Sequence, residues 1–147
     1  MSELNPAPRA KRPEFRNINA FNDLPGYRWP LASIVSGMHR ASGLMMFLLM
    51  PFIIWMFDTS VSSEISFARF TSAFNSGIGF IPGALIKLVA LGLIWAYLHH
   101  FFAGMRHIRM DLFHTVAKEE GKKTAQLTLI LSLGLTAVLG TKLFGLY

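Results

Sequence analysis

Two stretches of this chain place histidine, arginine and serine side chains together on one face of an expected helix. In the first stretch, Ser36, His39, Arg40 and Gly43 follow one another at i, i+3, i+4 and i+7, which aligns them along a single polar face. Taken singly, Arg40 could extend its guanidinium to the aqueous boundary, and Ser36 could bond its own backbone. Four such residues on one face instead indicate a site that faces a partner or a cavity.

The second stretch is richer in ionisable groups, which are His99, His100, Arg106, His107, Arg109 and Asp111. Within it, His100, Gly104 and His107 lie at i, i+4 and i+7, so they share one helix face. On an apolar helix a neutral imidazole is a suitable axial ligand for haem iron. A glycine one turn away leaves space for the flat macrocycle. We therefore expect His100 to be an iron ligand.

The remaining groups near His100 have two possible roles. His107, Arg106 or Arg40 could pair with the haem propionates, because charge-assisted hydrogen bonds suit carboxylates. Alternatively, a membrane histidine can donate a hydrogen bond to a neighbouring helix, and this alternative is strongest for His99.

Long windows without Lys, Arg, Asp or Glu must position these residues. Three such windows cover residues 41–57, 88–105 and 124–141. As helices, each would be about 26 Å long, close to a hydrocarbon core of about 30 Å. The sequence therefore predicts an all-α integral membrane protein with three transmembrane helices.

The expected boundaries follow from proline, glycine and charged residues. A polar N-terminal arm covers residues 1–30, and a three-helix membrane anchor covers residues 31–147, with helices at about 31–57, 84–113 and 123–146. Five prolines discourage a helix in the arm, which is either a disordered tail or a segment that lies on a partner protein. The first loop, residues 58–82, spaces Phe67, Phe70 and Phe74 as a short interfacial helix would.

Lysine and arginine are distributed unevenly among the connecting segments. The arm holds five, the first loop holds only Arg69, and the segment after the second window holds five. The positive-inside rule therefore predicts that the N-terminus and the second loop are inside, and that the C-terminus is outside. With the first two helices antiparallel, the stretches that contain Ser36 and His100 would then meet in the inner half of the membrane as one composite site.

Composition excludes several other classes of function. The chain has no cysteine, which excludes disulfides, thiolate metal sites and a cysteine nucleophile. The formal net charge of +6 comes from residues that flank the apolar windows, so we expect it to set orientation and not to bind nucleic acid. About forty mostly polar residues precede the first window, so we do not expect a cleaved signal peptide.

At these two stretches the chain resembles the haem-b-binding large membrane-anchor subunit of succinate dehydrogenase, the cytochrome b subunit of complex II. The second-helix signature of that family is matched by residues 100–111, HFFAGMRHIRMD, and its first-helix signature by residues 36–42, SGMHRAS. The three-helix layout and the chain length also agree, and the resemblance covers residues from about 27 to 147. Upstream the chain departs from the pattern, because Arg12 and Pro13 are followed by Glu14 and not by an apolar residue.

The resemblance implies a role for each matching residue. His100 would be one axial ligand of haem b, Ser36 and Arg40 would help to bind ubiquinone, and His39 and His107 would lie near the haem propionates. It also implies partners within a larger helical bundle: a second small membrane-anchor subunit that supplies the other haem ligand, an iron–sulfur subunit and a flavoprotein subunit, together with membrane lipid. The chain itself would carry no catalytic residue for succinate oxidation.

The resemblance places the protein in a bacterial inner membrane, or alternatively in the mitochondrial inner membrane. Three other functions stay open. The first is a fumarate reductase-type anchor that works in the opposite direction. The second is a cofactor-free structural or transport protein whose polar faces only pack helices together. The third, a self-contained cytochrome with two haems, needs four axial ligands, whereas the sequence offers at most two well-placed membrane histidines.

Overall fold

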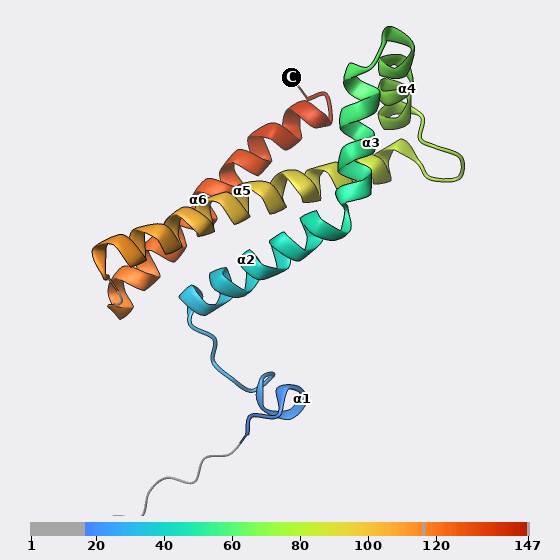
Figure 1. The fold of residues 1–147 in the computed structure, drawn as a ribbon. Coiled ribbons are helices and arrows are strands. Elements are labelled where there is room, and N and C mark those ends of the chain that lie inside the picture. Colours follow the sequence, from blue (N-terminus) through green and yellow to red (C-terminus); the bar gives the residue numbers. More distant parts are fainter. Residues whose placement is uncertain (1–16, 116, 147) are drawn as a thin grey trace, which may run out of the picture.

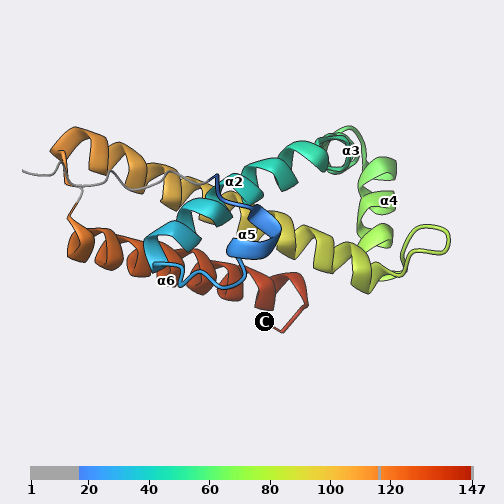
Figure 2. The ribbon, with the colours of Figure 1, turned by 90° about the horizontal axis from the view of Figure 1, so that it is seen from below.

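The computed structural model describes residues 17–115 and 117–146, and these ranges fold into helices joined by short connections (Figure 1). The helices are α1 (Ala20–Asp23), α2 (Leu31–Leu48), α3 (Met50–Val61), α4 (Glu64–Asn75), α5 (Gly83–Phe113) and α6 (Lys118–Leu143). Helices α2, α5 and α6 pack against one another, while α3 and α4 lie together at the end where α5 begins (Figure 2). The all-helical class predicted from the sequence is confirmed.

Two of these helices, α5 and α6, are each long and apolar enough to cross a membrane. Helices α2 and α3 satisfy the same criteria only as a pair, which is bent by 58° at the break between them. By length and composition, the described residues thus contain two helices that could cross a membrane, or three spans if the bent pair forms one crossing.

The first span is not the single continuous helix expected over residues 31–57. It breaks at Leu49, whose φ of −91° and ψ of 9° leave the helical region, and α3 then continues to Val61. Pro51 lies in the first turn of α3, where it has no N–H to donate and its ring would clash with the carbonyl of Phe47 in a continuous helix. The hydropathy of residues 41–57 did not predict this break, because hydropathy carries no information about backbone geometry.

The other helices differ from expectation mainly at their ends. The last helix begins at Lys118 and not near residue 123, so the connection after α5 is shorter than expected. Glu119 and Glu120 lie in the first turn of α6, where their negative charges interact favourably with the positive end of the helix dipole. The aromatic stretch of the first loop forms α4, which is capped reciprocally by Ser63 and Ser66.

Part of the N-terminal arm falls outside the described residues. Over residues 17–30 the chain contains the single-turn helix α1, whose N-terminus is capped by the side chain of Asn19. The remaining part of the arm, residues 1–16, is not described by the structure.

Small residues bring the three packed helices close together. Val35 of α2, Ala103 of α5 and Ala125 of α6 are fully buried in one cluster. Side chains of this size allow helix axes to approach closely, which is how membrane helices gain packing contacts in the absence of a hydrophobic driving force. This cluster sets the relative position of α2 and α5, the two helices that carry the sequence-predicted site.

Candidate functional site

Three histidines from two helices meet between α2 and α5. The rings of His39 and His100 stack with their centroids 4.0 Å apart and their planes at 25°. The ring of His107 lies beyond His39, with centroids 5.3 Å apart. We call His39, His100 and His107 the histidine cluster.

Two glycines make this close stacking possible. A Cβ atom on Gly43 of α2 would lie only 2.9 Å from Cε1 of His100, and a Cβ atom on Gly104 of α5 would lie 3.8 Å from Nε2 of His39. Each helix thus carries a histidine followed four residues later by a glycine, and each histidine packs on the glycine of the other helix. The space beside His100 is therefore provided by Gly43, and Gly104 borders His39; the expected role of Gly104 in leaving space for a haem macrocycle stays a prediction.

Hydrogen bonds determine which nitrogen of His100 is protonated. Its Nδ1 lies 3.0 Å from the backbone carbonyl oxygen of His39 and 3.3 Å from the Ser42 hydroxyl oxygen. The Ser42 hydroxyl also donates to that carbonyl, at 2.8 Å. Because a carbonyl oxygen only accepts, Nδ1 of His100 carries the proton and Nε2 keeps its lone pair.

This arrangement fits an axial haem ligand. Histidines that bind metal usually donate their other N–H to a carbonyl or carboxylate, which orients the ring and raises its basicity. Within residues 17–115 and 117–146, no three His, Asp or Glu side chains are arranged to hold a metal ion by themselves.

His39 cannot supply the opposite axial position for an iron held by His100. The rings of His39 and His100 lie face to face, with their planes at 25°, so their nitrogens would not both point at one iron between them. A second ligand would therefore come from outside this pair.

The first-helix residues Ser36 and Arg40 flank His39 on α2 but are not enclosed by the chain. Ser36 is half-buried and Arg40 is exposed. A pocket that encloses both side chains would need additional side chains from another molecule.

Arg106 lies apart from the histidine cluster. Its Nε donates to the Thr124 hydroxyl at 3.1 Å, and its Nη2 approaches the carbonyl oxygen of Gly121 at 3.5 Å, so the side chain faces α6. One residue corresponds to about 100° of rotation in a helix, which directs Arg106 away from the α2-facing side of His107. The contacts of Arg106 within the described residues are thus with α6, and its expected place on the propionate side stays a prediction.

His99 joins three helices, a role that the sequence left open. Its ring is fully buried and stacks on Trp95, with centroids 5.4 Å apart. Nε2 lies 3.4 Å from the carbonyl oxygen of Val35 in α2, and Nδ1 lies 3.3 Å from the Ser132 hydroxyl in α6. Ser132 is one of several polar residues in the charge-free window 124–141, so the sequence does not single it out, and the carbonyl acceptor has no signature in the sequence.

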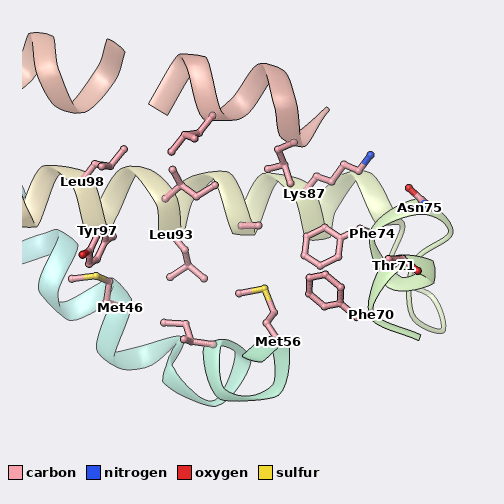
Figure 3. Close-up of a pocket in the computed structure, with 15 residues that line it drawn as sticks. Met46, Met56, Phe70, Thr71, Phe74, Asn75, Lys87, Leu93, Tyr97 and Leu98 are labelled. Carbon is pink, nitrogen blue, oxygen red and sulfur yellow. The ribbon is translucent and has the colours of Figure 1, made fainter. Parts of the chain in front are cut away.

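A large apolar cavity lies at the opposite end of the bundle, where α3 diverges from α2. It has a volume of about 690 Å³, and Figure 3 shows Met46, Met56, Phe70, Phe74 and Leu93 among the side chains around it. Of the described residues that line it, Lys87 is the only one of a charged residue type. The residues suited to redox or proton chemistry are therefore at the other end, in the histidine cluster.

Comparison with known proteins identifies the family of the chain. Residues 12–139 match the family described as succinate dehydrogenase/fumarate reductase transmembrane subunit. The chain is 32% identical over 123 residues to the succinate dehydrogenase cytochrome b556 subunit of Coxiella burnetii, an alignment that covers 84% of this chain and 89% of that protein.

A second relative is the succinate dehydrogenase cytochrome b556 subunit of Paracoccus denitrificans. It is 32% identical over 100 residues, which cover 68% of this chain and 72% of that protein. The resemblance noted from the two histidine-containing stretches is confirmed over most of the chain: the protein belongs to the family of succinate dehydrogenase/fumarate reductase transmembrane subunits.

Proposed function

We propose that this chain is the membrane anchor of a succinate:quinone oxidoreductase, that it binds haem b, and that it forms part of the ubiquinone-reduction site. One observation carries the proposal: His100 has its Nδ1 hydrogen-bonded to the His39 carbonyl and its Nε2 available on a membrane-spanning helix. The relatives that carry the name cytochrome b556 support a haem of the b type.

In this proposal Nε2 of His100 provides one axial ligand, and His39 and His107 lie on the side of the propionates. A second small membrane-anchor subunit would supply the other ligand of the haem. When bound, haem supplies a site that accepts and returns one electron at a time. The Ser42 hydroxyl and the His39 carbonyl hold the imidazole of His100 in its binding tautomer.

Ser36 and Arg40 then act on the quinone. As ubiquinone accepts two electrons and two protons, negative charge develops on its oxygens, and the fixed guanidinium of Arg40 stabilises that charge. The Ser36 hydroxyl provides a hydrogen bond to the quinone or its product. Since Arg40 is exposed on this chain, partner subunits complete the pocket.

The partners are an iron–sulfur subunit, which supplies the electrons, and a flavoprotein subunit, which oxidises succinate. The N-terminus and the connection between α5 and α6 face the cytoplasm of a bacterial cell, and the C-terminus lies outside. This orientation follows from the cluster of lysines and arginines at that end of the helices, where the soluble subunits would dock.

The decisive experiment compares wild type and His100→Ala in the purified complex. We expect a sharp low-spin b-type signal in the dithionite-reduced minus oxidised spectrum of wild type and its loss in the variant, because an axial ligand is removed. His114→Asn is the matched control, since His114 is exposed at the end of α5 and its left-handed φ of 52° is tolerated by asparagine. A normal signal in His100→Ala would contradict the ligand assignment, and a colourless wild-type complex would favour a cofactor-free anchor.

The quinone role is tested by Arg40→Ala in the same complex. Loss of one preorganised charge-stabilising donor typically costs about 10²-fold or more in kcat, so ubiquinone reduction should fall to a few per cent or less. Succinate oxidation with a soluble electron acceptor should be unchanged. Arg69→Ala, on the first loop, is the control. If Arg40→Ala retains both the activity and the KM for quinone, Arg40 has no part in the site.

A further inference from the structure

Arg106 is a buried cation without an anionic partner among the residues that the structure describes. Only 7% of the residue is exposed, and its acceptors are the Thr124 hydroxyl and the Gly121 carbonyl, both of which are neutral. Among the described residues, no carboxylate lies within ion-pair distance of it. The nearest candidate on α6, Glu120, contacts Arg109 at 3.9 Å and Lys123 at 3.7 Å instead. Burying an uncompensated charge is costly, so an anion from outside the described residues would stabilise Arg106 in this position.

This guanidinium lines a cavity of about 450 Å³ between α5 and α6. Three cations lie around the cavity, namely Arg106, Arg109 and Lys123, together with the single carboxylate of Glu120. The deeper wall is apolar and consists of Phe102, Met105, Leu127 and Leu131. The cavity therefore has a cationic mouth and an apolar floor.

The cavity also lies at the boundary between polar and apolar parts of the membrane. Lys123 is the last charged residue before the apolar window of α6, and Thr124 is the first residue of that window. The cationic groups are thus placed where lipid headgroups lie, and the floor extends toward the acyl chains.

We propose that this cavity is a binding site for a phospholipid with an anionic headgroup. The phosphate supplies the counter-charge to Arg106 and contacts Arg109 and Lys123, and an acyl chain covers the apolar floor. Guanidinium groups form strong, directional hydrogen bonds with phosphate oxygens, and the donors of Arg106 that are not directed at Thr124 and Gly121 are available for them.

The site is separate from the proposed cofactor site. His100 and Gly104 face α2, where they meet the His39 carbonyl and ring, whereas Arg106 faces α6. The lipid inference therefore goes beyond the proposed redox function and does not depend on haem or quinone binding.

The test measures lipid selectivity in the purified complex reconstituted into phosphatidylcholine vesicles. Spin-labelled phosphatidylglycerol and spin-labelled phosphatidylcholine are the two probes, and the immobilised fraction of each is read by electron spin resonance. We expect wild type to immobilise phosphatidylglycerol several-fold more than phosphatidylcholine. Arg106→Gln should abolish this preference, while Lys142→Gln, a charge removed at the other end of α6, should leave it intact.

Two further variants keep the proposal testable if Arg106→Gln fails to assemble. Lys123→Gln removes an exposed cation of the mouth, and Leu127→Trp fills the apolar floor while keeping every cation. Both should reduce the preference for phosphatidylglycerol at least threefold. The preserved b-type signal of each variant shows that the redox site is intact, which separates failure of this inference from failure of the proposed function.

Three outcomes would overturn the proposal. The first is an unchanged lipid preference in Lys123→Gln and Leu127→Trp. The second is displacement of phosphatidylglycerol by millimolar inorganic phosphate alone, which would identify a free-anion site. The third is an equal wild-type preference for both lipids, which would leave a carboxylate of another subunit as the counter-charge.

Discussion

At the residue scale, the histidine cluster depends on two glycines, which have no side chain and so leave room for the imidazole rings. Gly43 and Gly104 each let a histidine of the opposite helix approach the backbone, and His100 thereby reaches the carbonyl of His39. A carbonyl acceptor inside a helix is normally occupied by the helix's own hydrogen bond, but it has a second lone pair that an imidazole can use. The tautomer of His100 is thus determined by how closely two backbones pack.

This dependence predicts the effect of adding one methyl group. In Gly43→Ala, the new Cβ would lie 2.9 Å from Cε1 of His100, so the ring must move and its bond to the His39 carbonyl must weaken. We expect the b-type signal of the complex to fall by at least half or to shift in wavelength, as measured by the reduced minus oxidised spectrum. Gly37→Ala is the matched control, because nothing lies within 4 Å of its added Cβ.

The Gly37→Ala control also separates the contact with His100 from a general gain in helix stability. Both substitutions replace glycine by alanine in α2, so both gain the same helix propensity of about 1 kcal/mol. A difference between the variants therefore reports the contact with His100. Equal spectra for Gly43→Ala and Gly37→Ala would show that the ring has room to move without loss of iron binding.

At the scale of elements, His99 holds α2, α5 and α6 in one arrangement. It contacts a backbone carbonyl on one side and a serine hydroxyl on the other, both inside an otherwise apolar core. The adjacent His100 uses the same stretch of α5 for the proposed chemistry. Two neighbouring histidines thus have different roles because their side chains point to different sides of one helix.

We expect His99→Leu to loosen the bundle without removing the haem ligand. Hydrogen bonds between membrane helices contribute about 0.6 kcal/mol each on average, so the loss of two should cost about 1 kcal/mol. The b-type signal should be normal at low temperature, and its thermal loss should begin several degrees lower than in wild type. Phe101→Leu, a half-exposed aromatic on the same helix, is the control. An unchanged thermal profile would show that His99 does not link the helices energetically.

At the scale of the whole molecule, cationic and apolar features are segregated along the bundle. The histidine cluster and the Arg106 cavity lie toward one end, and the apolar cavity beside α3 and α4 lies toward the other (Figures 1 and 3). With the proposed orientation, the end that carries the ionisable groups faces the cytoplasm, where an iron–sulfur subunit would deliver electrons.

Cysteine labelling tests this orientation directly. The chain has no native cysteine, so Ser76→Cys after α4 and Ala117→Cys before α6 each supply its single thiol. An impermeant maleimide added to spheroplasts should label Ser76→Cys at once and Ala117→Cys only after the membrane is permeabilised. The reverse pattern would invert the orientation inferred from the lysine and arginine counts.

The sequence by itself determined those properties that belong to a single segment of the chain. The membrane class followed from the three charge-free windows, because a bilayer responds to the composition and length of a segment. The approximate extent of α5 followed from the same signal, and the shared face of His100, Gly104 and His107 followed from helical periodicity. These properties belong to one segment at a time and need no knowledge of its neighbours.

Only the tertiary structure decided which residues meet across helices. His100 and its neighbour Ser42 are 58 positions apart, and Arg106 and Thr124 are 18 apart. Their contacts depend on the rotation and offset of one helix against another. Packing of the small residues Val35, Ala103 and Ala125 sets both quantities, and no periodicity within a single helix encodes them. For this reason Gly43 makes room for the ring of His100, Gly104 borders His39, and Arg106 contacts α6.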